Sequence, residues 1–259
     1  MPVETPPEKK HEEEEELSGQ MTFLEHLEEL RKRIIHSLIA VAVAFGVTWY
    51  FANPLFKIVS VPIRKAGAEM ITTSLTGGFN VELKLAVLAA IFLAAPFILG
   101  QVWLFISPGL YKHERRYALP FIISSSLLFV IGGVFGYFVA FPFAAQFLVE
   151  WTKSMELVPR IDASEYFNLF IMVELGLGII FEIPALIFVL ARIGLVSGPF
   201  LLRNTRYAIL IAFIVAAVIT PTTDIPNMMM MAVPMVALYL LGVVVAYVFG
   251  KKRSPEPRD

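Results

Sequence analysis

The stretch that decides the fold is residues 85–105, which read LAVLAAIFLAAPFILGQVWLF. It carries no charged side chain, and it is long enough for a helix to cross the hydrocarbon layer of a bilayer, which needs about 20 apolar residues. Similar apolar stretches recur along the chain, and charged residues form short blocks between them. Of the 259 residues, 57% are hydrophobic and only 17% are charged, against about 25% charged in soluble domains. These features predict an all-α polytopic membrane protein.

Six membrane spans follow when the apolar stretches are taken in order. They cover approximately residues 34–52, 80–105, 117–141, 166–192, 207–220 and 227–248, within a transmembrane domain over 34–249. The fifth is short, since a helix over 207–220 at about 1.5 Å per residue is only roughly 21 Å long. Prolines inside the spans or at their edges predict kinked helices. These prolines are Pro96, Pro120, Pro142, Pro184 and Pro234.

The two ends of the chain differ from the spans. Residues 1–20 are polar and acidic and cannot bury enough apolar surface to fold, so we expect a disordered acidic tail. Residues 250–259 form a second polar tail. Between the first tail and the first span, residues 21–33 place apolar side chains such as Leu27 and Leu30 on one face and charges off it. This pattern predicts an amphipathic interfacial helix that leads into the first span.

Lysine and arginine predict the orientation. With the N-terminus inside, fifteen of them fall in cytoplasmic segments and five in the outer loops at 53–79 and 142–165, and Lys84, within a span, completes the 21. Because cytoplasmic loops carry an excess of Lys and Arg, we place both termini, and both tails, in the cytoplasm. The two outer loops are long enough to pack as a cap.

Ionisable side chains inside the spans are functional candidates, because each costs roughly 2.5–3.5 kcal/mol at mid-helix. Glu174 and Glu182 project from nearly the same helix face. Each is either a buried carboxyl with a structural hydrogen bond or part of a polar wall or proton-coupling site. Glu82 and Lys84 lie near the outer end of the second span, where reaching to the headgroups is the simpler interpretation. The glycines within 132–136 indicate close helix packing.

A second set of carboxylates is expected on the cytoplasmic side. Glu25, Glu28 and Glu29 precede the first span, and Glu114 lies in the loop after the second. Carboxylates on a rigid scaffold suit a cationic ligand, and arginine fits best because its planar guanidinium binds a carboxylate through two N–H groups. The alternative is that these carboxylates pair with arginines of the same chain, namely Arg31, Arg33, Arg115 and Arg116.

Several classes of protein find no support. The chain has no cysteine, which excludes disulfides and thiolate chemistry. The sequence has no phosphate-binding loop and no histidines at metal-ligand spacing, so we expect no metal, no cofactor and no nucleic-acid partner. The spans also contain no pair of residues typical of a catalytic site, so we do not expect an enzyme. The alternative to a receptor is a proton-coupled secondary transporter of a small solute, motivated by Glu174 and Glu182. That fold class predicts internal repeats, and no convincing repeat is visible.

Five motifs, in chain order, resemble those of the TatC family, the multi-spanning receptor subunits of twin-arginine protein translocases. They are HLEELRKR at 26–33, QVW at 101–103 with PGLYKHERR at 108–116, Gly178 with FEIP at 181–184, Arg206-Tyr207, and Thr220-Pro221 with Asp224. The resemblance extends over about residues 22–248, which is nearly everything outside the tails. Each motif is short, and their common order within six spans makes the resemblance specific.

The resemblance implies a concave six-helix bundle in the bacterial cytoplasmic (inner) membrane. Such a receptor binds the twin-arginine signal peptides of folded cargo proteins at the cytoplasmic face. It then nucleates an oligomeric translocation complex, which the proton-motive force drives. The implied partners are these signal peptides and small single-span subunits of the TatA and TatB type.

The resemblance also implies roles for particular residues. Glu29 and Glu114 would pair with the signal arginines, and His26, Arg31 and Phe105 would support them. In the membrane, Glu182 would face the concave cavity, whereas Glu174 is an extra carboxylate outside the motif. Near the last two spans, Thr220 and Asn227 would contact the single-span partner subunits.

Overall fold

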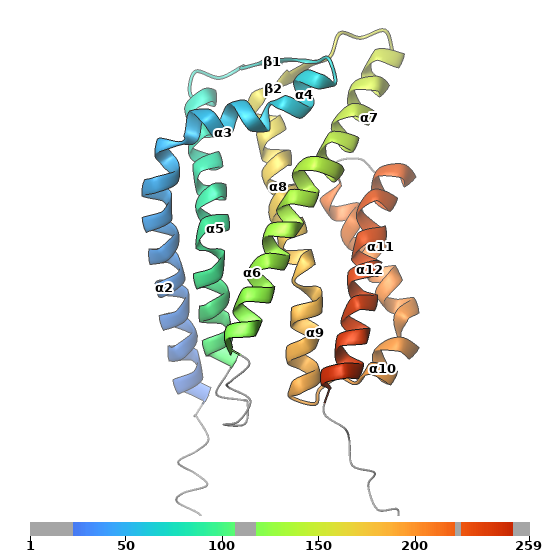
Figure 1. The fold of residues 1–259 in the computed structure, drawn as a ribbon. Helices are drawn as coiled ribbons and strands as arrows, with labels where there is room; N and C mark the ends of the chain where they lie inside the picture. The colour runs from blue at the N-terminus through green and yellow to red at the C-terminus, as the bar shows by residue number, and fades with distance from the viewer. Residues whose placement is uncertain (1–22, 107–117, 221–223, 251–259) are drawn as a thin grey trace, which may run out of the picture.

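The structure is a computed structural model that describes residues 23–106, 118–220 and 224–250. In this part of the chain, long helices form a bundle, and short helices with two short strands cover one end of it (Figure 1). Five helical stretches are long and apolar enough to cross a membrane, and a sixth apolar helix over Thr205–Ile219 is shorter. The predicted all-α polytopic fold with six spans is therefore confirmed.

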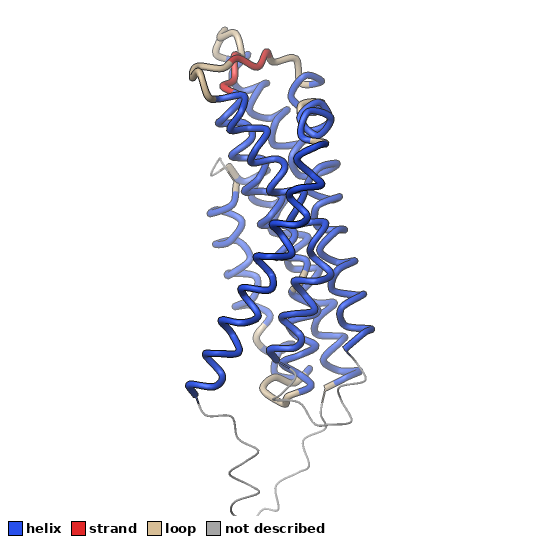
Figure 2. The backbone as a smooth tube through the Cα atoms, turned by 90° about the vertical axis from the view of Figure 1, so that its left-hand side faces the viewer, coloured by secondary structure: helices blue, strands red, loops and turns tan. Residues whose placement is uncertain are grey.

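The elements alternate between long membrane-crossing helices and short pieces of the connections. In chain order they are α2 (Phe23–Tyr50), α3 (Ala52–Val59), α4 (Val61–Lys65), β1 (Glu69–Ile71), α5 (Gly77–Ile106), α6 (Ala118–Phe135), the π-helical segment η3 (Gly136–Ala140), α7 (Phe141–Ser154), β2 (Arg160–Asp162), α8 (Ala163–Phe181), α9 (Ile183–Arg192), α10 (Gly198–Arg203), α11 (Thr205–Ile219) and α12 (Ile225–Phe249). The two described chain ends, Phe23 and Gly250, lie at the same end of the bundle, which we call the inner end. The opposite, outer end carries the strands (Figure 2).

The first helix differs from the prediction. We expected an interfacial helix over 21–33 that is distinct from the span beginning at residue 34, but α2 runs unbroken from Phe23 to Tyr50. Between Phe23 and Gly46 the chain has no proline or glycine, so nothing interrupts the backbone hydrogen bonds of this part of the helix. The amphipathic segment therefore forms the first turns of the membrane-crossing helix itself.

Prolines explain where the helices break. Pro184 has no N–H to donate, and its ring would meet the preceding turn, so α8 ends at Phe181 and α9 begins at Ile183. Pro142 lies at the start of α7, directly after η3. The helix is therefore interrupted at Pro184, and at Pro142 it changes from π to α geometry without a break. Helices α5 and α12 continue through Pro96 and Pro234. The predicted span 166–192 is accordingly two helices, with Glu182 at their junction.

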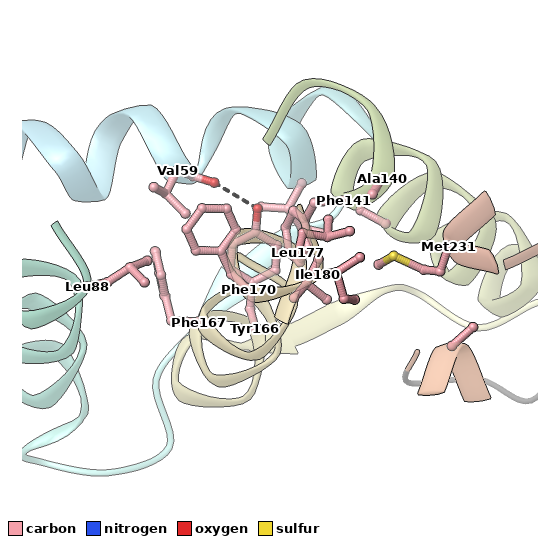
Figure 3. Packing of buried hydrophobic residues seen from close by; sticks show 14 of the residues in the cluster. Val59, Leu88, Ala140, Phe141, Tyr166, Phe167, Phe170, Leu177, Ile180 and Met231 are labelled. Carbon is pink, nitrogen blue, oxygen red and sulfur yellow. Dashed lines mark hydrogen bonds between the residues drawn. The ribbon is translucent and has the colours of Figure 1, made fainter. Parts of the chain in front are cut away.

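Helix α8 lies at the centre of the bundle and contacts α5, α6, α11 and α12. Its buried side chains include Phe167 and Leu177. The ring of Phe141 meets those of Tyr166 and Phe170 edge-on, with centroids 5.1 and 5.0 Å apart. Figure 3 shows this cluster drawing side chains from several helices around α8. Because α8 is packed on several sides, groups on it are held by the whole bundle.

The two outer loops pack as a cap, as predicted. Strand β1 pairs in parallel with β2, with Met70 opposite Ile161. The Tyr166 hydroxyl donates to the carbonyl oxygen of Val59 at 2.8 Å (Figure 3), and Lys153 Nζ donates to the carbonyl oxygen of Ala66 at 3.2 Å. These bonds join α3 to α8 and the end of α4 to α7.

Asp162 fastens the cap to the central helix. Its Oδ2 accepts from the backbone N and the hydroxyl of Thr73 at 2.9 and 2.7 Å. Its Oδ1 accepts from Ser164 N at 2.8 Å and so caps the N-terminus of α8. The hydrogen bond from the Thr73 hydroxyl lowers the pKa of the Asp162 carboxyl below its ordinary value.

This lowered pKa gives a pH prediction for the cap. A carboxyl with a depressed folded-state pKa stabilises the fold above its unfolded pKa of about 3.9, and that contribution is lost as the pH falls through the folded value. Hydrogen-exchange protection of the Thr73 amide should therefore fall below about pH 4. In Asp162→Asn, protection should be weaker at neutral pH and should change little on acidification. An equal acid-induced loss in both proteins would contradict the assignment.

Candidate functional site

The inner ends of α2 and α5 bring together three of the predicted signal-binding residues. The imidazole of His26 stacks on the ring of Phe105, with centroids 4.4 Å apart and an interplanar angle of 22°. Glu29 follows His26 by about one helical turn, so it lies on the same side of α2. Both His26 and Phe105 are half-buried, so the stacked pair remains partly accessible from the inner end. We call His26, Glu29, Arg33, Gln101 and Phe105 the inner-end cluster.

One oxygen of the Glu29 carboxylate is hydrogen-bonded within the described part of the chain, and the other is not. Arg33 Nη2 donates to Glu29 Oε1 at 2.9 Å, and Arg33 Nη1 donates to Gln101 Oε1 at 3.3 Å. The side chain of Glu29 is 13% exposed and that of Arg33 is 23% exposed. Among the described residues, no hydrogen-bond partner reaches the second oxygen, Oε2 of Glu29, although that oxygen is buried. Pairing within the chain therefore occurs at Glu29 and occupies one of its two oxygens.

The remaining predicted signal-binding residues are placed differently. Arg31 is exposed, and two residues along a helix bring its side chain about 200° around α2 from Glu29. Glu114 lies outside the described residues. The sequence interpretation missed Gln101 as a site residue, although a lone polar side chain within the apolar stretch 85–105 was a signal that could have identified it.

Glu182 lies at the junction of α8 and α9, where it is hydrogen-bonded across the bundle. The hydroxyl of Ser125 on α6 donates to Glu182 Oε2. This contact corresponds to the structural hydrogen bond that the sequence left as one alternative. A cavity of about 330 Å³ lies nearby between α6, α9 and α12 and is lined by Ser124 and Pro184, and Glu182 is not among its lining residues.

This bond gives a stability prediction. Ser125→Ala removes the donor from a carboxylate in the membrane-spanning part of the bundle, which should destabilise the protein by about 1–3 kcal/mol. The matched control is Ser126→Ala, because among the described residues the hydroxyl of Ser126 bonds within its own helix, to the carbonyl oxygen of Ile122 2.6 Å away. Thermal unfolding of the purified protein in detergent measures both. Equal losses in the two variants would show that the bond to Glu182 contributes nothing.

The carboxyl group of Glu174 packs against glycines, which leave room for it because they have no Cβ atom. The residue is 4% exposed, and its carboxyl group faces α6 and η3. A Cβ atom added at Gly136 would lie 2.7 Å from Glu174 Oε1, and one added at Gly133 would lie 3.2 Å from Glu174 Oε2. Oε1 has no hydrogen-bond partner among the described residues. Glu174 on α8 and Glu182 at the end of α8 therefore contact different turns of the segment formed by α6 and η3.

The polar residues near the last two helices are turned inward. Thr220 donates from its hydroxyl to the carbonyl oxygen of Ala216 at 2.8 Å. Asp224 Oδ1 accepts from Asn227 N at 2.9 Å, and Asn227 Nδ2 donates to Asp224 Oδ2 at 2.8 Å, which caps the start of α12. Both Thr220 and Asn227 are buried. They thus fix the ends of α11 and α12 and do not present side chains at the surface.

The carboxylates of the described residues are dispersed. Glu29 lies at the inner end, and Glu174 and Glu182 meet α6 at separate places. Within residues 23–106, 118–220 and 224–250, no group of three or more His, Cys, Asp or Glu side chains is placed to hold a metal ion. These carboxylates can accept hydrogen bonds and form ion pairs, as Glu29 does with Arg33.

Comparison with known proteins identifies the family. The family model described as Sec-independent protein translocase protein (TatC) matches residues 25–234. The chain belongs to the TatC family. The TatC protein of Koribacter versatilis is 48% identical over 252 residues, which are 95% of this chain and 92% of that protein. The TatC protein of Escherichia coli K12 is 39% identical over 238 residues, 90% of this chain and 92% of that protein.

Solved TatC structures share the fold. A crystal structure of the twin arginine translocase receptor TatC superposes with a TM-score of 0.74 at 35% identity and covers 85% of this chain and 97% of that one. A second, in DDM, gives a TM-score of 0.77 at 34% identity and covers 85% and 99%. Membership of the TatC family decides between the two functions expected from the sequence, since it favours protein translocation over transport of a small solute.

Proposed function

We propose that this chain is the receptor subunit of a twin-arginine translocase and binds twin-arginine signal peptides of folded cargo proteins at its inner end. The six-span TatC fold supports the receptor role, because its solved relatives are twin arginine translocase receptors. The excess of Lys and Arg in the predicted inner segments supports a cytoplasmic inner end. The membrane is accordingly the bacterial cytoplasmic (inner) membrane.

The main observation in support of the binding site is that only one of the two carboxylate oxygens of Glu29 is paired among the described residues. Arg33 engages one oxygen and leaves the buried Oε2 without a partner among the described residues. An unsatisfied buried carboxylate oxygen is costly, and a charge-assisted bond from an incoming guanidinium offsets that cost. Arg33 and Gln101 fix the position of the acceptor, so little order is lost when the ligand arrives.

The stacked pair beside Glu29 suits the same ligand. A guanidinium packs favourably on aromatic faces, and His26 and Phe105 present such a surface. Glu114 would supply a second carboxylate from the following loop, one for each arginine of the signal. Arg31, on the exposed side of α2, would act on acidic or polar groups of the cargo or its signal and not on the arginines themselves.

The single-span partner subunits of the TatA and TatB type would dock along α11 and α12. Thr220 and Asn227 support this indirectly, because their buried bonds hold the ends of the two helices in place. The outward side chains of α11, including Ile211, Ile214 and Val218, are exposed and apolar. The assembled oligomer would draw on the proton-motive force, for which Glu174 and Glu182 are candidate protonatable groups in the membrane.

Binding of synthetic signal peptides tests the receptor site. A peptide with paired arginines should bind the purified protein about tenfold more tightly than the same peptide with paired lysines, because lysine cannot bind a carboxylate through two N–H groups. Fluorescence anisotropy of the labelled peptides measures both affinities. A peptide with alanines in place of the arginines provides the baseline. Equal affinity for all three peptides would overturn the proposal.

A further inference from the structure

A groove between α5 and α8 opens toward the membrane at the outer half of the bundle. Its volume is about 360 Å³. Its walls are apolar, with Val87 and Ile91 from α5 and Ile171 and Leu175 from α8. Lys84 and Asn168 close its outer end, where Lys84 Nζ donates to Asn168 Oδ1 at 2.6 Å. Both helices run inward from these two residues. The groove is therefore polar at its outer end, which we call its mouth, and apolar further into the membrane.

Aromatic residues mark where this mouth lies in the bilayer. Trp49 and Tyr50 end α2 at its outer end, and the ring of Trp49 lies 5.8 Å from that of Phe79 on α5. Such aromatic residues sit at the level of the lipid headgroups. Lys84 follows Phe79 by five residues, or about 7.5 Å of helix. The mouth of the groove is therefore at the boundary between headgroups and acyl chains.

The ammonium of Lys84 lacks a counter-charge in the described part of the chain. No ion pair joins it to a carboxylate there, and it reaches across to α8. Glu82 lies about 200° around α5 and accepts from Asn53 Nδ2 at 3.5 Å. Glu165 lines a different cavity, between α4, α7 and α8. A cation at this depth favours an anion beside it.

We propose that this groove is a binding site for an anionic phospholipid, whose phosphate lies on Lys84 and whose acyl chain fills the groove. The charge and the polarity of the groove favour a lipid as its occupant. The walls run from Leu83 to Ile91 on α5 and from Asn168 to Leu175 on α8, about 12 and 10.5 Å along the helix axes. A phospholipid matches the groove in polarity, because its phosphate would lie at the polar mouth and its acyl chain would run inward along the apolar walls.

Native mass spectrometry of the full chain, with equimolar phosphatidylglycerol and phosphatidylcholine of identical acyl chains, tests the site. The intact protein should bind phosphatidylglycerol preferentially. Lys84→Gln should reduce that preference about fivefold, the value expected for one cation near an anionic lipid, and Lys84→Arg should retain it. The control Lys57→Gln removes an exposed outer cation that does not line the groove, and it should leave the preference unchanged.

A second variant tests the acyl chain separately from the headgroup. Val87→Phe fills the groove from its wall and should weaken retention of both lipids, while circular dichroism shows the helical content of the intact protein. The proposal is overturned if Lys84→Gln keeps the full preference, or if Val87→Phe retains both lipids as well as the intact protein does. It is also overturned if Lys84→Gln alters association with a single-span subunit and leaves lipid binding unchanged, because the groove then serves a protein.

Discussion

Gly132→Ala should destabilise the bundle by about 1–3 kcal/mol, the usual cost of overpacking, and lower Tm by about 2–12 °C. Gly132 lies where α6 crosses α8, and a Cβ atom there would lie 2.8 Å from the carbonyl oxygen of Leu177 and 3.0 Å from the Cα of Gly178. These neighbours are backbone atoms of the central helix, which cannot rotate away. The two helices would have to separate, which would also disturb the Ser125–Glu182 bond on the same pair of helices.

Gly46→Ala is the matched control for this substitution. Gly46 is also a glycine within a membrane-crossing helix, but nothing lies within 4 Å of a Cβ atom placed there. Thermal unfolding in the same detergent should show no loss for Gly46→Ala, since alanine has the higher helix propensity. A fall in Tm of equal size in both variants would show that the crossing of α6 and α8 does not depend on the glycine.

Glu29→Ala should abolish most export of a twin-arginine precursor while the protein still inserts in the membrane. The variant removes the acceptor of the inner-end cluster and leaves Arg33 without its carboxylate partner. A buried charge-assisted bond contributes about 1.5–3 kcal/mol, so binding of the signal should weaken by at least tenfold. Glu114→Ala should have a similar effect if it supplies the second carboxylate. Export of a precursor with a twin-arginine signal, measured in cells, reports both.

Glu28→Ala is the control for Glu29→Ala. It removes the same charge from the adjacent residue, but the Glu28 side chain is exposed. Export should remain near the level of the unaltered protein. Unchanged export in both Glu29→Ala and Glu114→Ala would contradict the assignment of the signal site. A loss as large in Glu28→Ala would indicate that net charge matters at the inner end and not the geometry around Glu29.

The sequence predicted the spans because run length and charge are local properties. Pro184 predicted the interruption between α8 and α9 because proline acts on its own backbone. The unbroken α2 was not predicted, since an amphipathic pattern does not state where a helix leaves the membrane surface. The π-helical η3 was also missed, because it depends on how the chain packs around Gly136.

Long-range partners were the part that sequence patterns could not supply. Glu182 was a candidate from its position in a span, but its partner Ser125 lies 57 residues away. The glycines of 132–136 were correctly assigned to helix packing, whereas the carboxyl of Glu174 that fits against two of them was not foreseen. His26 and Phe105 came from the family resemblance, and their stacking required the packing of α2 on α5.

Site-specific photo-crosslinking tests the central claim most directly. A photoreactive side chain would replace Leu27 on α2 or Leu104 on α5, both exposed neighbours of the stacked pair, with Tyr50 at the outer end as the control position. A twin-arginine peptide should crosslink at 27 and 104 and not at 50, and the crosslinks should disappear with paired lysines or in the Glu29→Ala background. Crosslinks that are insensitive to both changes, or that are equally strong at position 50, would contradict a receptor site at the inner-end cluster.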